Sequence, residues 1–572
     1  MKFWISACWI FLLFVGVWFI WFDRDRRHGR RRNTTTEMKS GVSGVLPEGN
    51  LGWPFVGETL DFIASGYTSQ PVSFMDKRKS RFGKVFKTHI LGTPIIVSTD
   101  PDVNKVILQN HGSTFIPAYP KSITELLGKY SILQMNGNLQ KKLHALIGGF
   151  LRSPQLKSQI TDAIEDSVKL ALDSWRDMSL VYVQQETRKI TFKILVKVLM
   201  SIGPGEDLDF LMREFGEFIK GLICLPIKFP GTRLYKSLKA KERLLKMVRR
   251  IVEERKLAME KSQEKGRVED VLDLLLRENG EGNEKQSLPL DFITDSIIEM
   301  MIPGEETVPM AMTLAVKFLS DCPVAIAQLT SDLLFSIGTR ALPRGRNTCE
   351  TESTRGGTQF MWLMHGRLSA VRFGIERLSD EDHLLIAWSC KLRCLSLKLS
   401  RIQCQRQRFL LQKSFMFLVI LIHDYGWSDY MSLPFTQNVI NETLRRANII
   451  NGVWRKALKD VEVKGYLIPR GWCVLASFIS IHMDIENYEN PYKFDPWRWE
   501  KIEGAVNNSR FTPFGGGQRL CPGLELSKLE ISIFLHHFVT TYRWVAEKDD
   551  IIHFPTVKMK RKLPIRVTPV AT

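Results

Sequence analysis

The chain has 572 residues, 44% of them hydrophobic, and a formal net charge of +19. This length exceeds what one hydrophobic core usually organises, so a large core and more than one subdomain are expected. Its nine cysteines are irregularly spaced, which argues against a secreted disulfide framework and favours reduced thiols. The positive charge forms no stripe interleaved with aromatic residues, so nucleic-acid binding is not expected.

The first predicted element is a membrane anchor. Residues 3–22 carry no charge, and six arginines follow within 23–32. Twenty apolar residues at 1.5 Å each match a hydrocarbon core of roughly 30 Å. A cleaved signal peptide is the alternative, but its basic residues would precede the apolar region and a small-residue cleavage site would follow it. The positive-inside rule then predicts a single pass with the body of the protein in the cytosol.

The remainder is predicted to be one mainly α domain with small β-sheets, an α+β class. Residues 23–58 are basic and then rich in proline and glycine, which predicts a linker ahead of a domain over 59–572. Alternating β-branched residues over 84–100 predict a hairpin around the Gly-Thr-Pro sequence at 92–94. Amphipathic periodicity predicts helices over 155–175, 185–201 and 237–262.

Two segments do not follow these patterns. Residues 222–235 are apolar with interspersed Lys228 and Arg233, and they are either a loop on the bilayer surface or an ordinary buried loop. From 330 to 424 both periods fade, four of the nine cysteines occur, and eleven arginines stand against three lysines. The cysteines at 390–404 fit no paired zinc-knuckle spacing, so a zinc site is not predicted.

The sequence PFGGGQRLCPG, residues 513–523, places Cys521 behind three glycines and close to Arg519. A lone thiolate binds a metal tightly when a cofactor supplies the other ligands, as with haem iron. Glycines would let the backbone approach a flat macrocycle, the helix expected just beyond Cys521 would favour the anion, and Arg519 could grip a haem carboxylate. An inert cysteine in a glycine-rich turn is the alternative reading of this motif alone.

Five residues in this stretch, Phe514, Gly517, Arg519, Cys521 and Gly523, form the pattern FxxGxRxCxG. This pattern resembles the haem-binding motif of the cytochrome P450 family. The resemblance implies that Cys521 is the axial ligand of the iron of haem b and that the other four residues surround the cofactor. It also implies a cytochrome P450 fold carrying an N-terminal transmembrane helix.

Further residues match this family in chain order. Glu442 and Arg445 lie one helical turn apart in an ExxR motif, and Arg498 follows in FDPWRW. The resemblance implies that these three close a buried network that supports the haem-side loop. Arg455 and His144 match positions near the haem propionates, although Leu139 and Gln140 stand where the family often has a tryptophan and basic residues.

The stretch 300–319 resembles the oxygen-binding helix of the family. Gly304, Glu306 and Thr307 take the positions of its glycine, acid and threonine. Pro303 cannot donate a backbone hydrogen bond and should bend the helix there. The resemblance implies that Glu306 and Thr307 deliver protons to bound dioxygen.

Residues 46–329 and 425–570 carry the resemblance, and their detail is similar to the plant brassinosteroid-biosynthetic branch, near its steroid carbon-23 hydroxylases. This implies a membrane-dissolved steroid substrate, dioxygen, an NADPH-cytochrome reductase partner and an endoplasmic reticulum membrane location. The reductase would approach the cysteine side, where Lys528 could help to steer it. Substrate would meet the segment 112–135. The other predicted substrate contacts are Ile302, Ile450, Asn451, Gly452 and Val453.

One departure from the family stands out. Glu442 follows Thr307 by 135 positions, more than twice the usual separation, and the excess falls within 330–424. Our hypothesis is that this stretch is translated non-coding sequence that interrupts the domain, and the alternative is a genuine surface insertion. The chain is therefore either an active monooxygenase or a haem-binding or misfolded inactive product. An oxygen-independent isomerase or dehydratase is disfavoured by Thr307.

Overall fold

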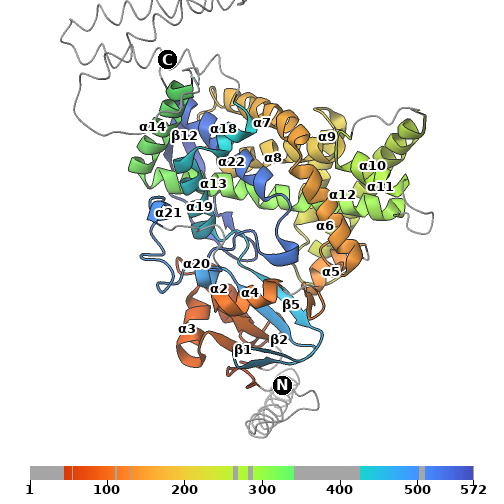
Figure 1. Ribbon diagram of the computed structural model, residues 1–572, viewed down its shortest axis with the longest axis vertical. Helices are drawn as coiled ribbons and strands as arrows, with labels where there is room; N and C mark the ends of the chain where they lie inside the picture. Colours follow the sequence, from red (N-terminus) through yellow and green to blue (C-terminus); the bar gives the residue numbers. More distant parts are fainter. Residues whose placement is uncertain are drawn as a thin grey trace, which may run out of the picture. The chain divides into compact units, whose positions relative to one another are not determined.

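The computed structural model describes residues 44–53, 56–109, 112–128, 130–261, 268–280, 288–340, 425–501 and 509–570. The described residues up to Thr330 and those from Tyr425 to Val570 form one compact unit, shown in Figure 1. The predicted anchor at 3–22 lies outside the described residues, and so does most of the stretch 330–424.

One part of this unit is a mixed β-sheet with short helices packed on it, in the lower half of Figure 1. The strand order is β1-β2-β8-β5-β3, and β2 pairs with β8 in parallel whereas the other pairs are antiparallel. Side chains alternate between the two faces of a strand, so Ile96 enters one core cluster while Ile95 and Val97 enter another. The elements are α2 (Thr59–Ser65), α3 (Ser73–Phe82), α4 (Pro101–Gln109), β1 (Val85–Ile90), β2 (Thr93–Ser98), β3 (Phe115–Pro117), β5 (Gly452–Ala457) and β8 (Cys473–Ser477).

The predicted hairpin is confirmed, but its turn lies one residue earlier than the Gly-Thr-Pro sequence indicated. Leu91 and Gly92 form the two-residue loop with φ of 52° and 76°. Two successive positive φ values match the twist of the flanking strands. Thr93 and Pro94 therefore belong to β2, where Pro94 pairs opposite His89.

The larger part of the unit is helical, and the predicted mainly α class with small sheets is confirmed. Ser153 begins one predicted helix, because its side chain accepts a hydrogen bond from the Leu156 N–H and Pro154 occupies the first turn. The helices are α5 (Lys121–Leu127), α6 (Asn138–Leu151), α7 (Pro154–Ser174), α8 (Val183–Met200), α9 (Glu206–Ile219), α10 (Arg233–Lys261), α11 (Val271–Gly280), α12 (Leu290–Glu306), α13 (Val308–Ser320), α14 (Pro323–Arg340), α18 (Trp427–Met431), α19 (Pro434–Ala447), α20 (Ile479–His482), α21 (Arg498–Lys501) and α22 (Leu524–Thr541).

Small sheets complete the unit. The three-stranded sheet has the order β4-β12-β9, and two hairpin-like pairs join β6 to β7 and β10 to β11. Their bounds are β4 (Val181–Tyr182), β6 (Val461–Val463), β7 (Tyr466–Ile468), β9 (Tyr542–Ala546), β10 (Ile551–Ile552), β11 (Lys558–Met559) and β12 (Pro564–Pro569).

The helices α12 and α13, green in Figure 1, cross the helical part and pack against α8, α10, α19 and α22. A bend was predicted at Pro303, but α12 continues through this residue and is interrupted at Thr307, which separates it from α13. Pro309 follows two residues later and, like Pro303, cannot donate a backbone hydrogen bond. Pro309 lies in the first turn of α13, a position that proline tolerates, and the break at Thr307 lies between the two prolines.

Among the described residues no single helix is both long and apolar enough to cross a membrane, whereas Leu290–Ser320 and Pro323–Leu333, bent by 113°, meet that test only as a pair and only by length and composition.

Candidate active site

The cysteine motif forms a compact loop that ends at the start of α22. The Cys521 N–H donates to the Phe514 carbonyl at 3.1 Å, and a short 3₁₀ turn, η5 (Gly517–Arg519), lies between them. Gly523 caps α22, and its N–H hydrogen bonds to the Cys521 sulfur. Burial raises the pKa of the Cys521 thiol, and this bond opposes the rise. A thiolate here is therefore favoured by the Gly523 N–H, by the helix start and by any cation bound to it.

Gly517 also allows a close approach within the protein itself. Gly517 has a φ of 63°, and a Cβ there would lie 2.2 Å from the carbonyl oxygen of Leu108 at the end of α4. Gly515 also has a positive φ, of 75°, whereas a Cβ on Gly516 would make only ordinary contact with Leu108. At Gly517 the close neighbour is thus α4, which fixes the loop against the sheet part of the unit.

Two side chains of α6 support the loop. The His144 Nε2 lies 2.7 Å from the Leu520 carbonyl oxygen, which can only accept, so Nε2 carries the proton. The Gln518 amide donates to Gln140 Oε1 at 3.0 Å. The placement of His144 near a haem carboxylate stays a prediction, and in the structure its ring binds the backbone beside Cys521. Gln140, noted only as a departure from the family pattern, is buried and holds the same loop.

Arg519 and Arg455 lie close together beside this loop. Arg519 donates from Nη1 to the Leu133 carbonyl at 3.2 Å and from Nη2 to the Met135 carbonyl. Arg455 donates to the Trp454 carbonyl at 3.0 Å. Burial lowers the pKa of both guanidinium groups, and the charge of Arg455 lowers the pKa of Arg519 further.

Neither Arg455 nor Arg519 has a carboxylate partner among the ion pairs of the described residues. The phenol of Tyr119 acts electrostatically on both arginines and hydrogen bonds to Arg455. Two partly desolvated cations that repel one another are stabilised by an anion brought in from outside. Tyr119 carries no sequence signal that would have placed it here.

The residues Glu442, Arg445 and Arg498 meet in one buried network. Arg445 donates to both Glu442 oxygens, from Nε at 2.9 Å and from Nη2 at 2.8 Å, and neither side chain is exposed. Arg498 Nε donates to Glu442 Oε1 at 3.1 Å, and Trp499 Nε1 donates to Oε2 at 3.0 Å. The backbone N–H of Asp495 adds a further donor at 3.0 Å. This carboxylate is fully surrounded by donors.

His482 connects this network to the cysteine loop. Its carbonyl accepts from Arg445 Nη1 at 2.7 Å, and its Nε2 accepts the N–H of Thr512 at 3.1 Å. Nδ1 therefore carries the proton and donates to Asn448 Oδ1 at 2.8 Å. Burial, aided by the Arg445 charge, lowers the pKa of His482 to about 3, so the ring stays neutral. No sequence pattern pointed to this histidine.

Two neighbouring carboxyl groups at the end of α12 share one arginine of α8. Arg188 Nη2 lies 2.8 Å from Glu305 Oε1 and 3.1 Å from Glu306 Oε1. Burial raises the pKa of Glu305 to about 7 and also raises that of Glu306, and Arg188 opposes both shifts. The Thr307 hydroxyl donates to the Pro303 carbonyl. The predicted acid and threonine thus adjoin a second carboxyl, Glu305, that sequence reasoning missed.

A glycine explains how close α12 comes to α8. A Cβ on Gly304 would lie 2.4 Å from Leu195 Cδ2. Gly304 therefore lets the two helices approach, which brings Arg188 within reach of the acidic pair.

The predicted substrate contacts differ in their surroundings. Ile302 is partly buried and Ile450 is exposed. The Asn451 amide donates to the His553 carbonyl at 3.0 Å, and a Cβ on Gly452 would lie 2.5 Å from the Ala476 carbonyl oxygen. Val453 packs against a core cluster of the five-stranded sheet. Within 450–453 Ile450 is exposed, whereas the other three residues are half-buried.

Lys528 cannot steer a partner protein. It is buried, and its Nζ donates to Asn441 Oδ1 at 2.9 Å. Burial lowers its pKa. The interpretation of Lys528 as a surface charge is wrong, because the helix α22 that carries it packs into the core.

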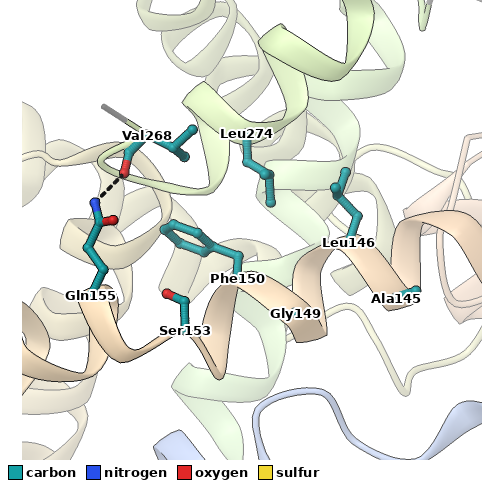
Figure 2. Close-up of a pocket in the computed structure, with 8 residues that line it drawn as sticks. All are labelled: Ala145, Leu146, Gly149, Phe150, Ser153, Gln155, Val268 and Leu274. Carbon is teal, nitrogen blue, oxygen red and sulfur yellow. Dashed lines mark hydrogen bonds between the residues drawn. The ribbon is translucent and has the colours of Figure 1, made fainter. Parts of the chain in front are cut away.

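Figure 2 shows an apolar surface pocket of about 420 Å³ between the end of α6, the start of α7 and α11. The Gln155 amide closes one side by donating to the Val268 carbonyl at 3.4 Å. The pocket contains no predicted site residue. It is lined by Ala145, Leu146, Gly149, Phe150, Ser153, Gln155, Val268 and Leu274. No cluster of three or more metal-binding side chains occurs within the described ranges.

The Cytochrome P450 family model matches residues 47–346 and 421–568, which include Cys521, the buried network and the α12–α13 break. The chain belongs to the cytochrome P450 family. Both the recognition of this family and the prediction of a P450 enzyme are confirmed. The family implies a haem iron with a thiolate ligand, and the donor set around Cys521 fits that group.

Comparison with similar proteins shows to which branch of the family this chain is related. The P450 chain is 59% identical, over 92% of its length and 85% of the relative, to 3-epi-6-deoxocathasterone 23-monooxygenase CYP90C1 of Arabidopsis thaliana. It is 44% identical, over 91% and 89%, to 3-epi-6-deoxocathasterone 23-monooxygenase CYP90D1 of the same plant. Its fold matches retinoic acid bound cyanobacterial CYP120A1 with a TM-score of 0.67 at 21% identity, over 92% of this chain and all of that one. The predicted brassinosteroid branch is confirmed as the place of this P450 in the family.

Proposed function

We propose that this P450 is a membrane-anchored steroid hydroxylase that oxidises carbon 23 of a brassinosteroid precursor with dioxygen and electrons from NADPH. One combination of features carries the proposal. A thiol lies at the start of α22, and two arginines near it have no carboxylate partner among the described residues. The chain that contains them is 59% identical to a 23-monooxygenase. The precursor class is 3-epi-6-deoxocathasterone, which both named Arabidopsis relatives use.

The residues that would hold the cofactor, haem b, are those of the cysteine loop. Cys521 would ligate the iron, and Arg455, Arg519 and Tyr119 would bind the haem carboxylates. Haem with a thiolate ligand supplies the activation of dioxygen for oxygen insertion into a C–H bond. Glu442, Arg445 and Arg498 hold the polypeptide behind the loop, and His482 transmits that support to Thr512.

Proton delivery is assigned to the break between α12 and α13. Burial raises the pKa of Glu306, so its carboxyl group holds a proton nearer to neutral pH than an exposed glutamate does. Arg188 keeps Glu305 and Glu306 side by side, which allows a proton to be exchanged between them. Thr307 holds a proton at Oγ1, one residue further along the chain.

The proposed membrane location is the endoplasmic reticulum, with residues 3–22 as a single span, the catalytic domain in the cytosol and an NADPH-cytochrome reductase as electron donor. The segment 222–235 supports contact with the bilayer surface. Leu225, Ile227 and Phe229 are 76%, 51% and 69% exposed, so the alternative of a buried loop is wrong. Exposed apolar side chains beside cations are typical of a segment that rests on lipid.

The stretch 330–424 is proposed to be translated non-coding sequence. The family model leaves residues 347–420 unmatched. Sequencing the transcript across these codons tests the proposal, and an uninterrupted transcript with matching peptides in the purified protein would contradict it. The buried network formed by Glu442 and Arg445, which follow the stretch, favours an active protein over a misfolded one.

The experiment for the proposed function uses the full chain, reconstituted with reductase in lipid vesicles and supplied with NADPH. With 3-epi-6-deoxocathasterone the expected product, identified by mass spectrometry and NMR, carries a hydroxyl group at carbon 23. A chain that shows the carbon monoxide spectrum of a thiolate-ligated haem but oxidises no steroid would contradict the substrate assignment. A chain that binds no haem would support the inactive alternative.

A further inference from the structure

Glu299 is a buried carboxylate of α12, one turn before Ile302, with only 5% of its surface exposed. Its Oε1 accepts the Ser131 hydroxyl at 3.0 Å and the Leu133 N–H at 2.5 Å, and its Oε2 accepts the Ile132 N–H at 2.9 Å. All three donors come from one short segment between α5 and α6. A single carboxylate therefore fixes this segment against α12.

The segment 131–135 is itself a closed turn. The Met135 N–H donates to the Ser131 carbonyl at 2.9 Å, and the Gln134 N–H donates to the Ser131 hydroxyl at 3.3 Å. A turn closed in this way moves as a unit, so the three bonds to Glu299 position all five of its residues.

The other side of the same turn holds Arg519. The carbonyls of Leu133 and Met135 accept from its two terminal nitrogens. Leu133 thus binds Glu299 through its N–H and Arg519 through its carbonyl. The chain of contacts runs from α12 through one peptide turn to the guanidinium two residues before Cys521.

We propose that Glu299 is a positioning residue for the haem site: by fixing the turn 131–135 it sets the place of Arg519, and so the strength with which the protein retains haem. This inference rests on haem binding, which the family implies, and not on the identity of the steroid.

The protonation state of Glu299 changes with pH close to neutrality. Burial raises its pKa to about 7, while the three donors and Lys241 of α10 oppose the rise. Lys241 also pairs with Asp295 of α12 at 2.8 Å. The charge of Glu299 contributes to the raised pKa of Tyr119. A protonated carboxyl group presents a hydrogen to three donors and accepts fewer bonds, so acid should loosen the turn.

The test is the rate at which haem leaves the full, haem-loaded chain for excess apomyoglobin, followed by absorbance. At pH 8 Glu299→Gln should release haem about tenfold faster than wild type, the loss expected when about one charge-assisted hydrogen bond no longer positions Arg519. At pH 6 the ratio should fall toward one, because wild-type Glu299 is then largely protonated. Glu299→Asp keeps the charge, so its rate of haem release at pH 8 should lie between those of wild type and Glu299→Gln. This variant serves as the test if Glu299→Gln does not fold.

Asp549→Asn is the matched control. Asp549 is also buried and accepts three backbone N–H groups, from Asp550 at 2.9 Å, Arg561 at 2.8 Å and Leu563 at 2.8 Å. None of these contacts reaches Arg519. The control should therefore leave haem release within about twofold of wild type, even if it lowers the melting temperature.

The pathway through Arg519 is tested by a double variant. Arg519→Lys keeps the charge but cannot hold two carbonyls in the same fork, so adding Glu299→Gln to it should change haem release little. A full tenfold effect in that background would overturn the proposal, as would equal acceleration by Asp549→Asn or no effect of Glu299→Gln at pH 8. A wild-type chain that takes up no haem would overturn both this inference and the proposed function.

Discussion

Two pairs of arginines, Arg445 with Arg498 and Arg455 with Arg519, differ in one respect. Arg445 and Arg498 surround Glu442, whose two oxygens receive donors from both guanidinium groups. Arg455 and Arg519 have carbonyl and phenol partners but no carboxylate among the described ion pairs.

We propose that this difference separates arginines that stabilise the fold from arginines that bind a ligand. The pair around Glu442 has a carboxylate counterion within the chain, so it contributes to folding without any added ligand. The charge of Arg455 lowers the pKa of Arg519, and a bound anion would offset this repulsion, as expected of the proposed haem carboxylates. The same residue type thus has two functions, distinguished by whether the chain also supplies the negative charge.

Glu442→Gln should have the largest effect. It leaves two buried cations without their counterion, and breaking such a network costs about 3–5 kcal/mol of the free energy of unfolding. We expect little haem-loaded protein and a melting temperature well below that of wild type, measured by circular dichroism. Wild-type stability in this variant would mean that the network is not what holds the cysteine loop.

Arg455→Met should leave the fold intact but weaken haem retention. Removing one of two mutually repelling cations relieves desolvation, so the fold should be retained or slightly stabilised. Haem retention should nevertheless fall, with transfer to apomyoglobin at least about tenfold faster, because one carboxylate partner is gone. A loss of fold comparable to that of Glu442→Gln would erase the distinction between the two pairs.

His482→Gln should change the response to acid. Burial holds the pKa of His482 near 3, below its ordinary value of 6.5, so the unfolded chain binds a proton that the folded chain refuses. The stability due to the neutral ring is present above pH 6.5 and is lost as the pH falls toward 3. The variant should therefore lose less melting temperature than wild type between pH 7 and 5.

His553→Gln separates this acid effect from the role of His482 in the site. Burial also lowers the pKa of His553, to about 4, so the same gain in acid resistance is expected. Only His482→Gln should reduce the share of haem with the thiolate-type carbon monoxide spectrum, because only His482 holds Thr512. Equal spectra in the two variants would show that this link does not matter.

Arg249→Gln should have the smallest effect on stability and on haem retention. It is the control for substitutions in both arginine pairs. Arg249 is exposed and pairs with Glu253 at 3.1 Å and Asp291 at 3.0 Å. Exposed pairs of this kind contribute about 0–1 kcal/mol. A change in haem retention here would indicate that arginine substitutions act through overall charge and not through the sites described.

Motifs and periodicity predicted much of this arrangement. The helices predicted at 155–175 and 185–201 correspond to α7 and α8 within two residues, because an apolar stripe reports a buried face directly. The ExxR spacing placed Glu442 and Arg445 on one helical face, where they meet. Local patterns of this kind predict contacts correctly because the interacting residues are close in sequence.

The remaining residues act through contacts that no local pattern encodes. Tyr119 meets Arg455 from more than three hundred positions away, and Glu299 reaches Arg519 only through the backbone of 131–135. His482 acts partly through its carbonyl, which is independent of residue type. The break at Thr307 lies four residues after Pro303, so that proline alone did not predict its position.

The central claim is that Cys521 is the thiolate ligand of a haem iron, and the reduced, carbon monoxide-bound absorption spectrum of the purified full chain tests it most directly. Wild type should show the strongly red-shifted haem band of thiolate ligation, and Cys521→Ser should lose that band while circular dichroism stays unchanged. The band persisting in Cys521→Ser, or a well-folded wild-type chain that takes up no haem when it is supplied, would contradict the claim.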